Sequence, residues 1–390
     1  MTLALQVLVL TAALQANKAA EIRRELDKNL NSGHARLDKG EIMGALGDYS
    51  KAISIDPKHA RGYSGRGMAY YRLGKPADAL KDFNRALEIE ARHTYAWIGL
   101  GDLKVDAGEF DVAIAEFNKA VEVNPTSAQA FAGRALGWAG KGEYDRAMMD
   151  FRRAADLLRT PADAWSYYYR GLSRHGVYEF EKAAADLAEA VKLDPKNSRF
   201  YLQRGKAALS LGNAKDAIAD FRKAASAEPN IPVSMALHGD ALYLQGSYPE
   251  AVDAWKKALG EKGARADDLR YRIWLAQSRA VQDKEAKEGL EAWLKDRKPA
   301  PDEVILLRIT AFFLGQILEA EFLKDIDNAS DRRSREKSCD LHFYAGVKRL
   351  LAGDKPAALA QFKHAVALST LDRFSGFASL AEIAALEGKK

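Results

Sequence analysis

The feature of this sequence that most constrains its fold is a pattern that recurs every 34 residues. Aromatic residues keep this spacing at Tyr49, Phe83, Phe117 and Phe151. Alanines keep it at Ala45, Ala79, Ala113 and Ala147. Two additional residues enter near Pro161, and the alanine spacing then resumes at Ala183, Ala217 and Ala251. A fixed period of this length is typical of stacked helical units that contact only their neighbours, rather than of one compact core.

Each period also contains the signals for a helix, a tight turn and a second helix. A glycine, which can end a helix in a left-handed conformation, stands at the turn in Gly40, Gly74, Gly108, Gly142, Gly212 and Gly246. A proline, which cannot continue a helix, follows the second segment at Pro57, Pro125, Pro195 and Pro229. The pattern therefore predicts two antiparallel helices in every repeat.

The period, the small residues and the closing prolines resemble those of tetratricopeptide repeats. One repeat supplies the family pattern at Trp97, Gly101, Ala113, Phe117, Ala120 and Pro125. Another supplies it at Tyr201, Gly205, Ala208, Ala217, Phe221, Ala224 and Pro229. The resemblance implies an all-α fold, a right-handed superhelix (α-solenoid) of about nine helical hairpins with a C-terminal capping helix.

Four segments are expected along the 390 residues. Residues 1–20 are a possible signal peptide or N-terminal helix, and residues 26–263 hold seven repeats. Residues 264–335 read as degenerate helical hairpins, and residues 336–390 as a final repeat-like hairpin with the capping helix. Within the degenerate part, helices are predicted over 267–281, 284–294, 303–313 and 318–326, followed by a polar loop over 327–336.

The N-terminus carries an apolar run over residues 3–14. The run is too short to span a bilayer as a helix, but it has the length of a signal-peptide core. Residues 14–16 would be a cleavage site, although the positively charged start of a signal peptide is missing. Export to the periplasm is the favoured prediction. The alternative is a cytoplasmic protein in which this run stays attached as a helix on the first repeat.

The C-terminal ninety residues show a second, narrower resemblance. The segments PAPDEVILL, FFLG, EKSCDLHFYAG and LLAGDKPAALAQFKHAVA, followed by a closing helix, are similar to the end of NlpI-like bacterial envelope proteins. That resemblance implies an adaptor that brings periplasmic proteases and cell-wall hydrolases to their targets. The lipid-attachment cysteine of such members has no counterpart here, which argues against a membrane anchor.

The charge and cysteine content exclude several function classes. The chain has 59 basic and 54 acidic residues, a mixed balance that does not favour nucleic acid, since nucleic-acid binding needs clustered basic charge. The single cysteine, Cys339, permits neither an internal disulfide nor a cysteine metal site, and it is expected to be a buried structural thiol. His342 and His364 share the last repeat, but two histidines do not complete a metal site.

No catalytic motif is apparent. The sequence lacks HExxH and a Walker-type phosphate loop. Residues 62–66, around Ser64, resemble a nucleophile elbow but lack its closing glycine and fall inside a predicted helix. We therefore assign no catalytic residue, cofactor or metal, and predict a protein that is not an enzyme.

Arginine and aspartate recur together at fixed positions. The arginines are Arg66, Arg134, Arg170 and Arg204. The aspartates, each 16 residues later, are Asp82, Asp150, Asp186 and Asp220. Because the two vary together, we predict ion pairs within or between repeats. An arginine-lined anion groove is the alternative.

The predicted function is protein–protein interaction, with an extended or helical peptide held on the concave face that the first helices line in this family. The predicted partner-binding residues are Arg61, Tyr95, Trp165, Tyr168, Leu172, Arg199, Lys206 and Tyr243. The site is centred on repeats five and six, although Trp165 would also be explained by packing over the insertion near Pro161. The setting is a bacterial cell envelope, and the alternatives are a cytosolic scaffold or the regulatory subunit of an enzyme complex whose catalytic domain lies on another chain. The sequence leaves the partner and the oligomeric state open.

Overall fold

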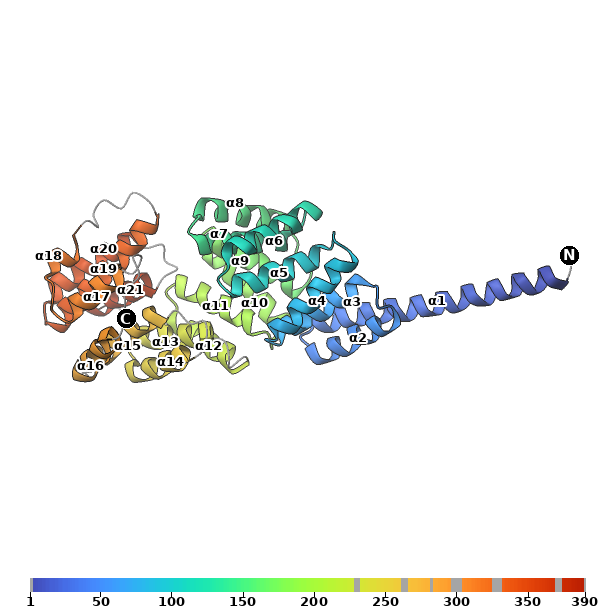
Figure 1. The fold of residues 1–390 in the computed structure, drawn as a ribbon. Coiled ribbons are helices and arrows are strands. Elements are labelled where there is room, and N and C mark those ends of the chain that lie inside the picture. The colour runs from blue at the N-terminus through green and yellow to red at the C-terminus, as the bar shows by residue number, and fades with distance from the viewer. Residues whose placement is uncertain are drawn as a thin grey trace. The chain divides into compact units, whose positions relative to one another are not determined.

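A computed structural model describes residues 3–227, 232–260, 266–280, 283–295, 304–324, 332–368 and 374–388. These residues form helices joined by turns and contain no strand (Figure 1). The chain divides into two compact units. The N-terminal unit comprises Met1–Glu179 and Ala188–Lys196, and the C-terminal unit comprises Phe180–Leu187 and Asn197–Lys390. The helix α10 (Phe180–Leu193) contributes to both.

The N-terminal unit is a row of helical hairpins. Its helices are α1 (Leu3–Asp38), α2 (Ile42–Ile55), α3 (Ala60–Arg72), α4 (Pro76–Ile89), α5 (Thr94–Asp106), α6 (Phe110–Val123), α7 (Ala128–Lys141), α8 (Tyr144–Leu157) and α9 (Ala164–Gly176). The first helices α1, α3, α5, α7 and α9 pack against one another in succession, as the inner row of a curved stack does.

The C-terminal unit continues the hairpins and ends in a single helix. Its helices are α11 (Ser198–Ser210), α12 (Ala214–Ala227), α13 (Pro232–Leu244), α14 (Tyr248–Gly260), α15 (Ala266–Arg279), α16 (Asp283–Lys295), α17 (Val304–Phe313), α18 (Glu319–Phe322), α19 (Arg332–Leu351), α20 (Lys355–Leu368) and α21 (Phe374–Leu386). The sequence boundary expected at residue 263 falls inside this unit.

The periodic small and aromatic residues form the core of each hairpin. Ala79 and Phe83 are fully buried, as are Ala113 and Phe117 one repeat later. A Cβ atom added at Gly101 would lie 2.7 Å from the ring of Phe117, so the helices approach as closely as glycine allows. The predicted all-α solenoid is confirmed. Among the described helices, α1–α2, α3–α4, α5–α6 and α7–α8 form hairpins in the N-terminal unit, and α11–α12, α13–α14, α15–α16 and α19–α20 form hairpins in the C-terminal unit.

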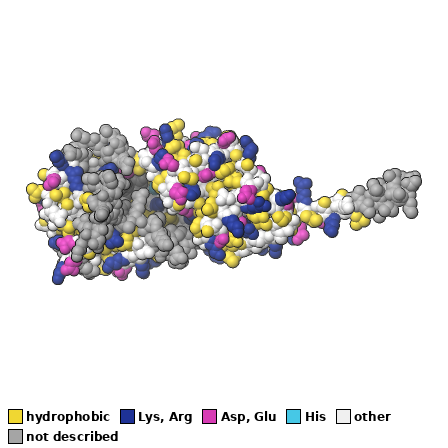
Figure 2. Space-filling view, in the orientation of Figure 1, with side chains coloured by type: hydrophobic (Ala, Val, Ile, Leu, Met, Phe, Trp, Pro, Cys, Tyr) yellow, Lys and Arg dark blue, Asp and Glu magenta, His cyan; other side chains and the backbone are white. Residues whose placement is uncertain are grey.

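The first helix extends well beyond its hairpin. Residues 14–25 of α1 are exposed on every side, and Leu26 is the first buried residue of the helix among those with described side chains. Figures 1 and 2 show this segment projecting from the hairpins of the N-terminal unit. Residues 14–25 therefore do not pack on the first hairpin, while the side chains of residues 1–13, which hold most of the apolar run, lie outside the described part of the chain. None of the helices that the structure describes is long and apolar enough to span a membrane.

The tail differs from the sequence prediction in two places. The helix α17 agrees with the predicted 303–313, and α18 covers Glu319–Phe322 of the predicted 318–326, of which residues 325–326 lie outside the described residues. The predicted polar loop over 327–336 is wrong from Arg332 onward, because α19 begins there. Glu336 and Ser338 are 6% and 2% exposed, so these polar residues belong to a packed helix rather than to a solvated loop.

Candidate partner-binding site

Two of the predicted binding residues form an exposed pair on the N-terminal unit. Arg61 and Tyr95 are each the second residue of a first helix, in α3 and α5 respectively. Arg61 is exposed, and Tyr95 is 56% exposed. Both helices are otherwise well buried, as Tyr71 (7% exposed) and Ile98 (1%) show. Tyrosine and arginine are among the residue types that most often dominate binding energy at protein interfaces.

Three predicted binding residues lie inside the N-terminal unit instead. Tyr168 and Leu172 are 6% and 5% exposed. Trp165 is half-buried and packs edge-on against Tyr168, with ring centroids 5.2 Å apart. The guanidinium of Arg72, from α3, lies 4.2 Å from the centroid of the Trp165 ring. Trp165 therefore helps to hold α3 and α9 together, and Tyr168 packs beside it within α9.

Arg72 is the centre of that internal contact. Besides facing Trp165, it donates a hydrogen bond to the carbonyl of Leu37 at the end of α1. Burial lowers the pKa of Arg72 to about 10, while the carboxylates of Asp38 and Asp194 and the hydroxyl of Tyr169 act in the opposite direction. The side chain stays protonated at neutral pH, so it brings a positive charge to the place where the first and fifth hairpins meet.

The remaining predicted residues belong to the C-terminal unit. Arg199 and Lys206 are both half-buried on α11. Tyr243 on α13 is 3% exposed, because the last helix α21 covers it. The hydroxyl of Tyr243 donates to Oε1 of Glu382 at 3.3 Å, and its ring centroid is 5.3 Å from that of Phe374. The chain's own C-terminal helix thus occupies the face that Tyr243 was predicted to offer to a partner.

The predicted arginine–aspartate pairs are confirmed at Arg66, Arg134 and Arg204. Arg66 donates two hydrogen bonds to Asp82, at 2.7 and 2.9 Å. Equivalent two-bond pairs join Arg134 to Asp150 and Arg204 to Asp220. Each pair joins the two helices of one hairpin, so these arginines serve the structure. In the fourth repeat Arg170 donates to the carbonyls of Leu158 and Arg159.

A serine, a histidine and a glutamate form a row that the sequence analysis did not predict. Ser64 Oγ lies 2.7 Å from His93 Nε2, and His93 Nδ1 lies 3.2 Å from a carboxylate oxygen of Glu90. The order resembles a hydrolase triad, but Ser64 and His93 are only 5% and 7% exposed, and Ser64 lies inside α3 rather than at an elbow. Burial lowers the pKa of His93. The row therefore joins the second hairpin to the third and offers no access to a substrate.

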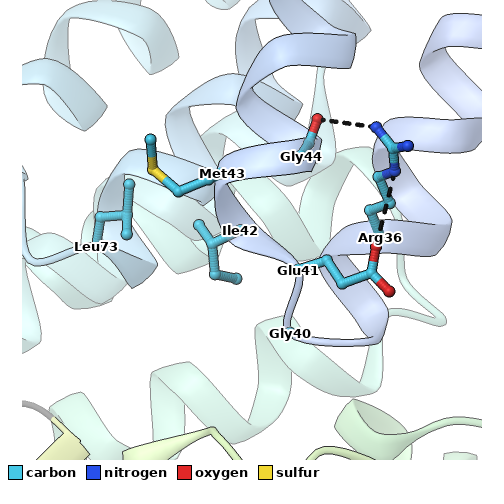
Figure 3. Close-up of a pocket in the computed structure, with 7 residues that line it drawn as sticks. All are labelled: Arg36, Gly40, Glu41, Ile42, Met43, Gly44 and Leu73. Carbon is cyan, nitrogen blue, oxygen red and sulfur yellow. Dashed lines mark hydrogen bonds and ion pairs between the residues drawn. The ribbon is translucent and has the colours of Figure 1, made fainter.

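An open pocket lies beside the turn of the first hairpin (Figure 3). It has a volume of about 580 Å³ and is lined by Arg36, Gly40, Glu41, Ile42, Met43, Gly44 and Leu73. Arg36 occupies one side, where it lies 3.8 Å from Glu41, and Met43 is 72% exposed on the other. The pocket combines an ion pair with apolar side chains. It contains none of the predicted binding residues. The described residues hold no cluster of three or more metal-binding side chains.

The exposed face of the described residues carries both signs of charge. Figure 2 shows lysine and arginine interspersed with aspartate and glutamate over the visible surface, with no large area of one sign. Such a surface matches the mixed composition of 59 basic and 54 acidic residues. It gives this face no broad basic track of the kind that nucleic-acid binding requires.

Comparison with known families supports the repeat pattern. A family model described as TPR repeat matches residues 33–74, and models described as tetratricopeptide repeat match residues 60–93, 98–165 and 178–231. No curated protein matches the chain in sequence. The matches cover most of the first six hairpins.

Several solved structures are similar in fold. A chain of the APC/C hetero-tetramer Cut9–Hcn1 has a TM-score of 0.56 and 18% identity, over 75% of this chain and 55% of that one. The human IFIT1 dimer with PPP-AAAA has a TM-score of 0.51 and 14% identity, over 90% of this chain and 95% of that one. A tetratricopeptide repeat protein from Parabacteroides merdae has a TM-score of 0.39 and 18% identity, over 65% and 99%. At these identities the likeness concerns the fold alone.

Proposed function

We propose that this tetratricopeptide-repeat protein is a non-catalytic adaptor that binds a protein or peptide partner along the first helices of its N-terminal unit. Repeats of this kind support a protein-interaction scaffold in general. The finer proposal concerns the place of binding and the cellular compartment.

The observation that carries the proposal is the exposed pair Arg61 and Tyr95. They occupy the same position in consecutive repeats, so they lie on neighbouring helices of one row. Most aromatic side chains of these hairpins are buried or half-buried, whereas Tyr95 is 56% exposed. Trp165 supports the same row from within, because its contact with Arg72 joins α9 to α3. Arg199 and Lys206 on α11 remain proposed contacts of the C-terminal unit.

A site-specific photocrosslinker at position 95 tests this site. The matched control is position 149, because Met149 is 70% exposed on a second helix, α8. Crosslinking in the native host is expected to capture one partner from position 95 and not from position 149. In the purified complex, the double variant Arg61→Ala with Tyr95→Ala is expected to weaken binding by about tenfold or more. Equal capture from both positions, or unchanged affinity in the double variant, would contradict the proposal.

We propose the bacterial cell envelope as the setting. The support is the apolar run over residues 3–14 and the similarity of the C-terminal ninety residues to NlpI-like adaptors. N-terminal sequencing of the protein from its native host tests the compartment. A start near Asn17 is expected if the run is removed on export. An intact Met1 or Thr2 would favour the cytosolic scaffold instead.

A further inference from the structure

The C-terminal helix α21 contacts helices that are distant from it in the sequence as well as the last hairpin. It packs on α19 and α20, as a capping helix would, but it also packs on α13, more than a hundred residues earlier in the chain. Phe377 of α21 reaches the apolar cluster that contains Leu209 and Ala241. The helix therefore lies across the first helices of the C-terminal unit, in the place where a bound helical peptide would lie.

Phe374, the first residue of α21, is held in an aromatic box. The rings of Tyr243, Trp255 and Phe343 have centroids 5.3, 5.8 and 5.7 Å from that of Phe374. The guanidinium of Arg272 lies 4.7 Å from the same ring centroid. These four residues come from α13, α14, α19 and α15. A box of rings and a cation selects an aromatic side chain, since both kinds of contact act on its ring.

Glu382 is held two turns further along α21. Its carboxylate accepts a hydrogen bond from the hydroxyl of Tyr243 and one from the guanidinium of Arg279, both at 3.3 Å. Its side chain is 6% exposed, so the charge is buried beside its partners. Eight residues separate Phe374 from Glu382, which corresponds to about 12 Å along a helix. The face beneath α21 thus recognises an aromatic ring and a carboxylate at a fixed separation on one helix.

The fit of α21 to this face is imperfect. Ser379 is fully buried, and its hydroxyl has no hydrogen-bond partner among the residues that the structure describes. A buried hydroxyl without a partner costs free energy that alanine at the same position would not cost. A helix of similar pattern without that serine would bind more favourably than α21 itself.

We propose that the face of α13, α15 and α19 beneath α21 is a helix-binding site, with α21 as its resident occupant. Its partner is an amphipathic helix that carries an aromatic residue and, eight residues later, a carboxylate, and this helix displaces α21. The site lies in the C-terminal unit and does not depend on the pair Arg61 and Tyr95, so either proposal can fail without the other.

An engineered disulfide can hold α21 in place, so that binding can be compared with α21 fixed and with α21 free to leave. Cys339, the only cysteine of the chain, lies in α19 with its Sγ 3.4 Å from the hydroxyl of Ser375 in α21. The variant Ser375→Cys places two thiols at this contact, and oxidation would join α21 to α19. The probe is a fluorescein-labelled peptide of residues 374–388 with Ser379→Ala. A second peptide, with Phe374 and Glu382 also replaced by alanine, is the control.

Fluorescence anisotropy on the full-length chain gives the readout. The probe is expected to bind the Phe374→Ala chain at least tenfold more tightly than the wild type, because the competing α21 is weakened. The oxidised Ser375→Cys chain should not bind the probe, and reduction should restore binding. The control peptide should bind no variant. Equal binding to the locked and reduced chains would overturn the proposal. So would an absence of binding to folded Phe374→Ala and Glu382→Ala chains, as judged by circular dichroism.

Discussion

At the scale of single residues, the arginine–aspartate pairs show how a repeat keeps a polar contact in its core. Asp82, Asp150 and Asp220 are each buried and each accept two hydrogen bonds from an arginine of the same hairpin. In the first hairpin the aspartate remains as Asp48, but it is served by Ser32 at 2.6 Å and by Arg36 at 2.9 Å. The buried aspartate therefore needs hydrogen-bond donors at this position, and these donors need not all come from one arginine.

We expect Arg66 and Asp82 to couple energetically. A double-mutant cycle with Arg66→Ala and Asp82→Ala should give a coupling energy of about 1–2 kcal/mol, because the pair is partly shielded from solvent. The matched control is Arg85 with Glu88, whose side chains are 47% and 63% exposed. That cycle should give a smaller coupling energy, because solvent screens an exposed pair. Equal coupling energies, measured by urea unfolding, would show that burial does not set the strength of the pair.

Tyr178 takes the left-handed backbone conformation that glycine takes in the other repeats. Its φ is 66°, and Gly142 at the equivalent turn has φ 82°. Because a side chain in this region costs about 1 kcal/mol, Tyr178→Gly is expected to raise the free energy of unfolding by about 0.5–1 kcal/mol. Gly142→Ala should lower it by about 1 kcal/mol. Thermal melts of the two variants should shift in opposite directions, and a shift of the same sign would refute this account.

At the scale of helices, stacking depends on glycines that face the aromatic rings. The ring of Phe117 fits between Gly101 of its own hairpin and Gly133 of the next, and a Cβ atom at either glycine would meet that ring at under 3 Å. The phenylalanine therefore fills the space of two missing side chains. This contact fixes the approach of three helices at once, α5, α6 and α7.

Gly101→Ala is expected to destabilise the stack by about 1–3 kcal/mol through overpacking against Phe117. Gly47 provides the matched control, because it also lies inside a helix, α2, but a Cβ atom there would meet nothing within 4 Å. Gly47→Ala should stabilise the protein by about 0.5–1 kcal/mol, since alanine favours a helix interior. The stabilities of both variants are measured by denaturant unfolding. If Gly47→Ala also destabilised the protein, the loss in Gly101→Ala would not be due to the contact with Phe117.

At the scale of the whole molecule, each unit is closed by a contact between distant segments. In the N-terminal unit, Arg72 connects the end of α1 with Trp165 of α9. In the C-terminal unit, α21 returns to α13. Both contacts involve residues that the sequence analysis assigned to partner binding, and both explain why Tyr168, Leu172 and Tyr243 are buried.

Arg72→Ala should destabilise the N-terminal unit by about 2–4 kcal/mol, since it removes a charged hydrogen bond and a cation–π contact. Arg72→Lys keeps the charge over Trp165 but loses the planar guanidinium, so its effect should be intermediate. Urea unfolding followed by tryptophan fluorescence is the measurement. A midpoint that does not change in Arg72→Ala would mean that this contact does not hold the unit together.

The docking of α21 should weaken as the pH rises. Burial raises the pKa of Glu382 above its ordinary value, even though Arg279 and Tyr243, the charged and titratable groups facing it, lower it. A carboxyl with a raised pKa contributes stability that is fully present below its unfolded pKa of about 4.3 and is lost as the pH rises through the folded value. The protection factors of the α21 amides, which correct for the intrinsic pH dependence of exchange, should therefore fall from acid toward neutral pH, and Glu382→Gln should remove that fall.

Much of the fold could be predicted, because it is encoded within one repeat. The helix ends follow from glycine and proline, and the pairs 16 residues apart, such as Arg66 with Asp82, are neighbours within a single hairpin. The start of α19 at Arg332 was not predicted, since a run of polar residues favours a loop in the sequence, although Glu336 and Ser338 are buried in the structure. The repeat positions predicted correctly that Arg61 and Tyr95 are exposed on the first helices. They did not predict that Trp165 and Tyr243 pack against other parts of the chain.

The repeating hairpin, its core and its internal ion pairs follow from the amino-acid sequence, because they depend on spacing within about 34 residues. Which inward-facing residues are covered depends instead on contacts between distant parts of the chain. Arg72 meets Trp165 across 93 positions of the chain, and Tyr243 meets Glu382 across 139. Such contacts depend on the small rotation that each repeat adds to the last. That rotation accumulates over several repeats, so it cannot be predicted from the residue pattern of a single repeat.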